Sequence, residues 1–145
     1  MRLVKEILNY KGNDIWFVGS ETVIFDAINL MSEKSIGALI VKDNDKLAGM
    51  VTERDYARKV ILEGRSSKHS LVKDIMTKHV ICVTPDRTIE ECMALMTDKR
   101  VRHLPVVVNK HVIGLVSIGD LVKAIIAEQK FLIDQLQHYI TGEKG

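Results

Sequence analysis

The chain has 145 residues and a formal net charge of +2. This length fits one domain, or two halves that share a core. The small net charge gives no support for a nucleic-acid-binding protein, and no segment approaches the ~18 apolar residues of a membrane span. The first residues lack the apolar core of a signal peptide, so we expect a cytoplasmic protein.

The first half of the chain predicts elements in the order β-α-β-β-α. An apolar run at 15–18 suits a strand, and apolar residues at helical spacing follow at 24–31. Two β-rich runs at 38–41 and 47–51 flank a polar turn, which predicts a hairpin. A second helix starts near Thr52. The apolar face of that helix comprises Tyr56, Ala57, Val60 and Ile61.

The second half of the chain predicts the same order of elements. A strand is expected at 80–83, a helix at 89–96 and a hairpin from 104–108 and 112–116. The last helix begins near Ser117. The residues of this helix that we expect to be buried are Leu121, Val122, Ile125 and Ile126.

The two halves are an internal repeat. Residues 23–56 align with 88–121 without a gap, at an offset of sixty-five and with ten identities in thirty-four positions. Similarity held in one register over this length indicates that the working unit is a pair of like modules. Any binding chemistry is therefore expected twice, and at the junction between the copies.

The repeat and its flanking segments give a division of the chain into four parts. These are a first repeat at 3–62, a linker at 63–70, a second repeat at 71–128 and a C-terminal helical tail at 129–145. The linker is rich in polar residues and has no periodic apolar pattern. The tail has apolar residues at helical spacing, which either cover the module's own core or pack against a second chain. They are Phe131, Ile133, Leu136 and Ile140.

Cysteine and histidine usage gives no sign of a metal or redox site. Cys82 is expected on a strand and Cys92 on a helix, both within apolar patterns, which favours buried, reduced thiols. The histidines, at positions 69, 79, 103, 111 and 138, show no close metal-ligand spacing. We therefore predict no metal. No phosphate-binding loop of the Walker type is present, and no nucleophile or base can be identified from residue order.

One motif closes each repeat, at 49–55 and at 114–120. It reads Gly, two apolar residues, Thr or Ser, two further residues and Asp. A hydroxyl followed three residues later by an acid is typical of a capping box at a helix start, although Glu or Gln usually provides the acid. The motif can also bind a nucleotide. The helix start favours phosphate, the Asp can accept hydrogen bonds from ribose hydroxyls, and the apolar residue after Gly can contact a purine.

The repeated β-α-β-β-α order, with this motif closing each copy, resembles a tandem pair of CBS domains, also called a Bateman module. It is similar in particular to small stand-alone bacterial CBS proteins, over roughly residues 3–126. The run at 96–106 is also typical of the family. The resemblance implies an α/β (α+β) fold in which the repeats pack as a pseudo-twofold pair. It also implies two clefts that hold adenosine compounds: AMP, ADP, ATP, NAD or S-adenosylmethionine.

In this family each cleft combines the Gly-to-Asp motif of one copy with the entry strand of the other. The first implied site comprises Met50, Thr52, Arg54, Asp55, His79, Ile81 and Arg102. The second comprises Asn13, Trp16, Gly37, Leu115, Ser117 and Asp120. The acids of the two motifs are expected to accept the ribose hydroxyls, and the arginines to neutralise phosphate. Because Gly37 stands where the second repeat has Arg102, the first site is expected to be the better phosphate site.

We therefore predict an adenine-nucleotide-binding regulatory module that acts allosterically on a partner protein or on its own dimer, without catalysis. The resemblance implies a homodimer, with a contact surface from 24–31, 89–96 and the tail. Plain structural interpretations remain for Arg54 and Arg102 as surface residues and for Trp16 as a core residue. The alternative functions are a structural dimerisation module with vestigial clefts and a small nucleotide-processing enzyme.

Overall fold

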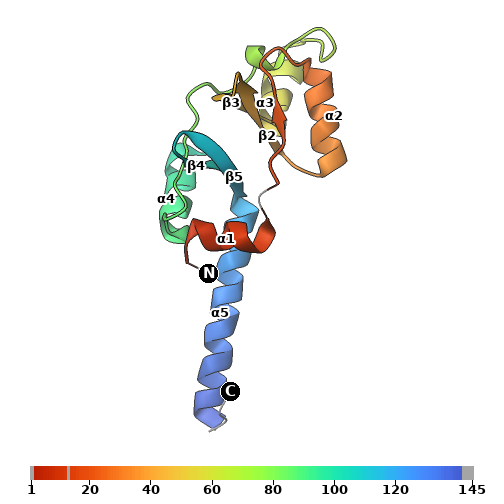
Figure 1. Cartoon of the computed structure of the whole chain (residues 1–145). Coiled ribbons are helices and arrows are strands. Elements are labelled where there is room, and N and C mark those ends of the chain that lie inside the picture. Colours follow the sequence, from red (N-terminus) through yellow and green to blue (C-terminus); the bar gives the residue numbers. More distant parts are fainter. Residues whose placement is uncertain (1, 13, 142–145) are drawn as a thin grey trace.

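The computed structural model describes residues 2–12 and 14–141, and its elements follow the predicted order except for the entry strand of the second half (Figure 1). In the first half they are α1 (Val4–Lys11), β1 (Phe17–Val18), α2 (Ile24–Lys34), β2 (Ala38–Asp43), β3 (Lys46–Thr52), α3 (Glu53–Tyr56) and the π-helical turn η1 (Ala57–Ile61). The rest are the 3-10 turn η2 (Val72–Asp74), α4 (Ile89–Lys99), β4 (His103–Val108), β5 (His111–Ser117) and α5 (Ile118–Thr141).

Both predicted hairpins are confirmed, and they match in detail. β2 pairs with β3, and β4 with β5, in antiparallel fashion. Each turn has two residues, 44–45 and 109–110, and all four have positive φ, the conformation that fits the twist of a tight hairpin. A bulge follows Val41 in the first hairpin and Val106 in the second, which are equivalent positions of the repeat. The shared register shows that the repeat extends to backbone geometry.

The entry strands are shorter than predicted. In the first half β1 pairs in parallel with β2 through its two residues. In the second half, the strand expected at 80–83 is reduced to one bridge between Val83 and Val106. The next bond of a parallel ladder would need the backbone amide of Pro105, which proline lacks. The first half has Ile40 at that position, so its strand can form.

Each half has its own hydrophobic core, and the segment that leads into one repeat packs on the other. Val4, Ile7 and Leu8 of α1 are buried in the core of the second repeat, against β5 and α5 (Figure 1). Val72 and Ile75, at η2, are buried in the core of the first repeat. The two repeats are therefore interleaved, because the core of the second repeat takes in α1 from the start of the chain and the core of the first takes in the first residues of the second repeat.

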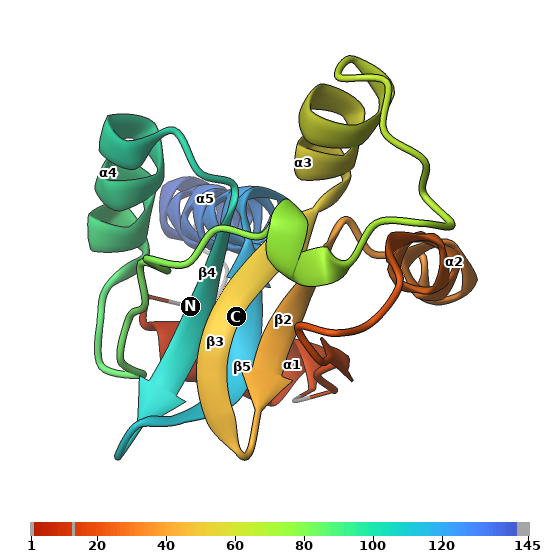
Figure 2. The same ribbon diagram turned by 90° about the horizontal axis from the view of Figure 1, so that it is seen from above.

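A third apolar cluster joins the two halves. Ala38, Ile40 and Met50 are buried there, and Val112 and Leu115 pack against them from the other hairpin. Figure 2 shows β3 and β5 side by side at this junction. The two hairpins thus pack face to face as the predicted pair of repeats, and the positions just beyond the strand ends come together.

The helices differ in how much of their apolar surface is covered. A contact of α2 and α4 with a second chain stays a prediction, because Phe25 on α2 is 45% exposed, whereas six residues of these helices are buried in the cores of their own repeats. These residues are Ile24, Ala27, Met31, Ile89, Cys92 and Met96. On α5, Leu121 is buried as predicted, but Val122 and Ile126 are 41% and 57% exposed, against expectation.

The two thiols are free, and burial raises the pKa of both. Cys92 is buried on α4, as predicted, whereas Cys82 lies half-buried in a segment that forms no strand. Within the described ranges, 2–12 and 14–141, no helix has both the length and the apolar character to span a bilayer.

Candidate functional site

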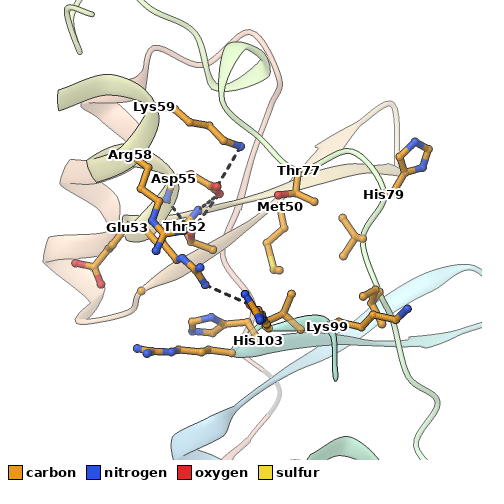
Figure 3. A pocket seen from close by; sticks show the side chains of 17 residues that line it. Met50, Thr52, Glu53, Asp55, Arg58, Lys59, Thr77, His79, Lys99 and His103 are labelled. Carbon is orange, nitrogen blue, oxygen red and sulfur yellow. Dashed lines mark hydrogen bonds and ion pairs between the residues drawn. The ribbon is translucent and has the colours of Figure 1, made fainter. Parts of the chain in front are cut away.

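A pocket of about 470 Å³ lies at the junction of the repeats, beyond the end of β3 (Figure 3). Its walls come from β3 and α3 of the first repeat, from the segment at 77–81, and from the turn that leads into β4 at 99–103. The residues predicted for the first site that line this pocket are Met50, Thr52, Arg54, Asp55, His79, Ile81 and Arg102. All members of that predicted set are therefore brought together.

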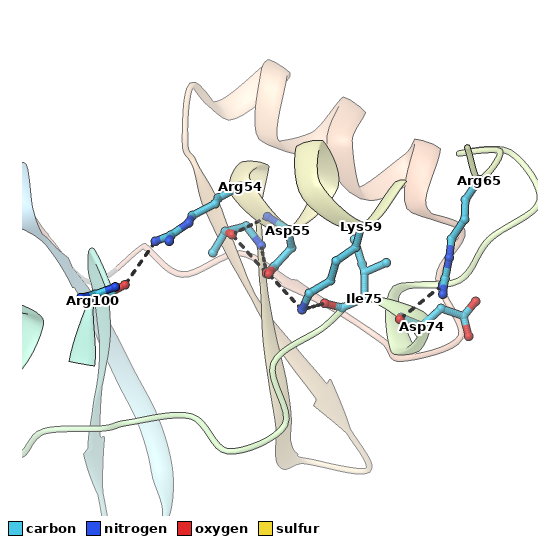
Figure 4. Close-up of polar contacts among 8 residues, drawn as sticks. Arg54, Asp55, Lys59, Arg65, Asp74, Ile75 and Arg100 are labelled. Atoms are coloured by element: carbon cyan, nitrogen blue, oxygen red, sulfur yellow. Dashed lines mark hydrogen bonds and ion pairs between the residues drawn. The ribbon is translucent and has the colours of Figure 1, made fainter. Parts of the chain in front are cut away.

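The motif of the first repeat forms the capping box that its sequence suggests. Thr52 Oγ1 accepts a hydrogen bond from the Asp55 amide at 3.1 Å, and Asp55 Oδ2 accepts one from the Thr52 amide at 3.0 Å. Asp55 Oδ1 lies 3.3 Å from Lys59 Nζ, which also donates to the Ile75 carbonyl at 3.0 Å (Figure 4). The local cap thus fixes the direction of the Asp55 carboxylate at the edge of the pocket.

An arginine of the first repeat reaches across the pocket to the second. Arg54 donates from one guanidinium nitrogen to the carbonyl oxygen of Arg100 at 3.2 Å (Figure 4). Arg100 ends α4 in the left-handed conformation, with φ of 55°, which directs its carbonyl group away from the helix. This bond ties the two repeats together at the pocket, so Arg54 is more than a solvent-facing surface residue.

The motif of the second repeat forms the same cap, and its acid also pairs with a lysine, which here comes from α1. The Ser117 amide donates to Asp120 Oδ2 at 2.8 Å, and the Asp120 amide donates to Ser117 Oγ at 3.2 Å. Lys11 Nζ, from the end of α1, donates to the same Asp120 oxygen at 2.7 Å and to the Leu115 carbonyl at 3.0 Å. A built-in ammonium group therefore occupies the acidic corner of the second predicted site.

Gly37 and Trp16, which were also predicted for the second site, each have other contacts. Gly37 lines the first pocket, because it directly precedes β2 and accepts a backbone hydrogen bond from Glu53 at the start of α3. Trp16 is 38% exposed, which excludes a fully buried core role, and Lys34 Nζ lies 4.2 Å from the centre of its ring. Asn13 lies outside the described residues.

Two titratable groups near the junction have shifted pKa values. Burial lowers the pKa of His103, and the positive charges of Lys11 and Arg102 add to this against the opposite effect of Asp120. Burial alone raises the pKa of Asp120, but the hydrogen bond and charge of Lys11 and the Ser117 amide hold it below its ordinary value. His103 is therefore neutral, and Asp120 ionised, near pH 7.

Sequence reasoning missed several basic residues that line the pocket, although some left a signal. Arg58 and Lys59 lie one helical turn after Asp55, and Lys99 is one of the identities of the repeat. Lys11, which contacts Asp120 at the second predicted site, lies before the aligned region and left no such signal. Among the described residues, no group of three or more His, Cys, Asp or Glu side chains is arranged to hold a metal ion.

Comparison with known proteins identifies the repeat. The family model described as the CBS domain matches residues 4–62 and 72–127. The chain is 42% identical over 149 residues to the Arabidopsis thaliana CBS domain-containing protein CBSX3, mitochondrial, covering 96% of this chain and 72% of that protein. It is also 38% identical over 102 residues to A. thaliana CBSCBSPB2. This match covers 70% of this chain but 19% of that longer relative.

Solved structures agree with this match. A protein with CBS domains from Burkholderia ambifaria MC40-6 is 54% identical with a TM-score of 0.85, over 88% of this chain and 96% of that one. The CBS domain pair of protein MJ0100, solved with 5-methylthioadenosine and S-adenosyl-L-methionine, has the same fold at 24% identity, with a TM-score of 0.77 over 87% of this chain and 97% of that one. This chain therefore belongs to the CBS domain family, as a tandem CBS pair of the α+β class and a regulatory module.

Proposed function

We propose that the pocket binds one adenine nucleotide and that this binding regulates a partner protein or the module's own dimer. The observation that carries the proposal is the convergence of an acid, apolar side chains and arginines from both repeats on one pocket. Its volume, about 470 Å³, falls within the ~300–1,000 Å³ of small-molecule sites. The adenosine ligands bound by the CBS pair of MJ0100 support the same ligand class.

Each part of a nucleotide has a matching group in the pocket. Met50 and Ile81 offer apolar walls for the adenine ring, and Asp55 offers carboxylate oxygens to the ribose hydroxyls. Arg54 and Arg102 present guanidinium groups from opposite repeats to the phosphate. Because the ligand contacts both repeats, its binding favours one arrangement of the two halves, and this is the physical basis for regulation.

Calorimetry with AMP, ATP, NAD and S-adenosylmethionine tests the site. A ligand of this size is expected to bind with a dissociation constant on the order of 10 μM. Asp55→Asn, which can still cap the helix, should weaken the tightest ligand at least tenfold, by removing the charge that grips the ribose. Asp120→Asn should leave that affinity within about twofold, because Asp55 lines this pocket and Asp120 does not. Equal losses in both variants would contradict the site assignment.

A melting experiment separates this function from a structural dimerisation module with vestigial clefts. At a ligand concentration about 100 times the dissociation constant, binding adds about 2.7 kcal/mol to the free energy of unfolding. For a chain of this size that raises Tm by roughly 5–10 °C. No rise with any adenosine compound at millimolar concentration would favour the structural module. Release of hydrolysis products from ATP, abolished by Asp55→Asn, would instead show an enzyme.

We also propose a homodimer formed through α5. The end of this helix projects from the body of the molecule (Figure 1), and apolar side chains on it recur every seven residues. The recurring sets are Ile126, Ile133 and Ile140, and Ile125, Leu132 and Tyr139. All of these residues except Ile125 are more than half exposed, and so is Leu136. Leu132, Leu136 and Tyr139 are spaced four and three residues apart, which is the spacing of the apolar seam between two paired helices.

A second copy of the chain is a suitable occupant for this face of α5. Between Val122 and Thr141, two lysines are balanced by two acids, so like charges do not oppose pairing. Replacing Leu136 with Asp should convert the dimer to a monomer in sedimentation or light-scattering measurements, whereas Lys130→Gln should leave it a dimer. A monomeric wild-type chain, or a dimer that survives Leu136→Asp, would contradict this interface.

The cytoplasmic location expected from the sequence stays a proposal. Free thiols such as Cys82 and Cys92 persist in reducing compartments, while the A. thaliana relative is named as mitochondrial. Cell fractionation with an antibody to the protein tests this directly, because recovery outside the cytoplasmic fraction would contradict it.

A further inference from the structure

The pocket concentrates positive charge beyond what binding of a monophosphate requires. Its cationic lining residues are Arg54, Arg58, Lys59, Lys99, Arg100 and Arg102. Its acidic lining residues are Glu53 and Asp55. The pocket therefore has an excess of four positive charges with histidines neutral, whereas the whole chain has a net charge of +2. The remainder of the chain is net negative, so the charge is focused on this cleft.

Several of these cations have no acidic partner. Lys59 is held by Asp55, and Lys99 lies 3.8 Å from Asp98. By contrast, Arg58, Arg100 and Arg102 make no ion pair with any side chain in the described part of the chain. Like charges gathered without counter-charges repel one another, and a bound anion relieves that repulsion. Guanidinium groups favour phosphate because they can donate two parallel hydrogen bonds to it.

The unpaired arginines also come from both repeats. Arg58 belongs to η1 of the first repeat, and Arg100 and Arg102 lie between α4 and β4 of the second. The bond from Arg54 to the Arg100 carbonyl spans the same gap, at 3.2 Å. A chain of several phosphates can contact both sides of this gap, whereas a single phosphate offers fewer oxygens to share between them. The charge and its distribution thus point to an extended anion.

We propose that the pocket selects adenosine polyphosphates, ATP and ADP, over AMP, and rejects S-adenosylmethionine. This inference rests on the proposed function, because it assumes an adenosine ligand at this site. AMP has about two negative charges at neutral pH and ATP about four, so that ATP matches the excess of positive charge. S-adenosylmethionine has a sulfonium and an ammonium group against a single carboxylate, so it is net positive and the cluster of arginines disfavours it. NAD has one negative charge on each of its two phosphates and a positive charge on its nicotinamide ring. Its net negative charge is therefore smaller than that of ADP, and we expect it to bind less tightly than ADP.

Calorimetry with adenosine, AMP, ADP, ATP and S-adenosylmethionine, in EDTA, tests the ranking. ATP should bind at least tenfold more tightly than AMP at about 0.15 M salt, with ADP between them. The ratio should fall toward unity at about 1 M salt, where the screening length is only ~3 Å. ATP no tighter than AMP, or S-adenosylmethionine as tight as ATP, would overturn the inference.

Variants identify the arginines as the cause. In Arg58→Gln/Arg102→Gln, the ratio of ATP affinity to adenosine affinity should fall at least tenfold, because adenosine has no phosphate. Lys123→Gln/Lys130→Gln removes two exposed charges from α5 and should keep the wild-type ratio. Circular dichroism and melting confirm that each variant is folded. An equal fall in both double variants would overturn the inference, since net charge alone would then explain the preference.

The outcomes separate this inference from the proposed function. If neither adenosine nor any nucleotide binds the wild-type protein, the proposed function fails and this inference fails with it. If adenosine and AMP bind, and Asp55→Asn weakens both, while ATP gains nothing over AMP, the proposed function stands and only the polyphosphate preference is refuted.

Discussion

Replacing Lys11 with Met removes the ammonium group that occupies the acidic corner of the second cleft, while it keeps most of the side-chain length. Lys11 Nζ donates hydrogen bonds to Asp120 Oδ2 at 2.7 Å and to the Leu115 carbonyl at 3.0 Å. Both contacts tie α1 to the second repeat, more than a hundred residues further along the chain. We expect their loss to destabilise the fold and to leave the Asp120 carboxylate without its cation.

The size of the effect follows from the exposure of the pair. A hydrogen bond between charged groups contributes about 1.5–3 kcal/mol when buried, and much less at the surface. The Asp120 side chain is 17% exposed and that of Lys11 is 35% exposed, so solvent screens part of the interaction. We therefore expect Lys11→Met to lower the free energy of unfolding by about 1–2 kcal/mol at pH 7, equivalent to a fall in Tm of roughly 3–6 °C.

The pH dependence has a definite sign. The pKa of Asp120 lies below its ordinary value of 3.8 in the folded protein, so its contribution is present above that value and is lost as the pH falls through the folded pKa. Lys11→Met should abolish most of this contribution. The stability difference between wild type and variant should therefore be constant from pH 7 to 5 and should shrink as the pH drops below about 4.

Urea unfolding of Lys11→Met, Asp120→Asn and the double variant measures the coupling between the two residues. We expect a coupling free energy of about 1 kcal/mol or more at pH 7. Lys5→Met, at an exposed position of the same helix, is the matched control and should change stability by less than ~0.5 kcal/mol. A coupling near zero, or equal losses from the Lys5 and Lys11 variants, would refute the view that Lys11 anchors α1 through Asp120.

Other substitutions test the packing of the repeats. Gly49→Ala should cost about 3 kcal/mol in urea unfolding, because the new Cβ would lie 2.6 Å from the Thr77 carbonyl oxygen. Gly114→Ala should cost less, since its Cβ meets the end of the Leu8 side chain, at 2.7 Å, and no backbone atom; the reverse order would contradict this. Thr88→Ala should cost about 1 kcal/mol through loss of the α4 capping box, and an unchanged melting curve would count against that cap. Cys92, fully buried with a raised pKa, should react with a thiol reagent only as fast as the protein unfolds; rapid labelling of the native protein would disprove its burial.

Features that depend on neighbouring residues could be predicted from the sequence. Helical spacing located α2 and α4, and polar residues between β-rich runs located both hairpins. The Thr52 and Asp55 pair, and its copy in the second repeat, indicated the capping boxes. A match between two copies of the same chain made these local patterns more certain than either copy alone, because each element was read twice.

The way in which the two copies combine could not be predicted, because it depends on long-range packing. Nothing in the periodicity of α1 shows that it packs on the second repeat, or that Lys11 reaches Asp120. The strand expected at 80–83 does not extend beyond one bridge, because Pro105 on β4 has no amide hydrogen to donate. This proline lies more than twenty residues further along the chain. Likewise, Arg58 and Arg102 come from different repeats and meet only at the pocket. Such contacts depend on which apolar faces pack together at long range, and sequence spacing alone does not encode that choice.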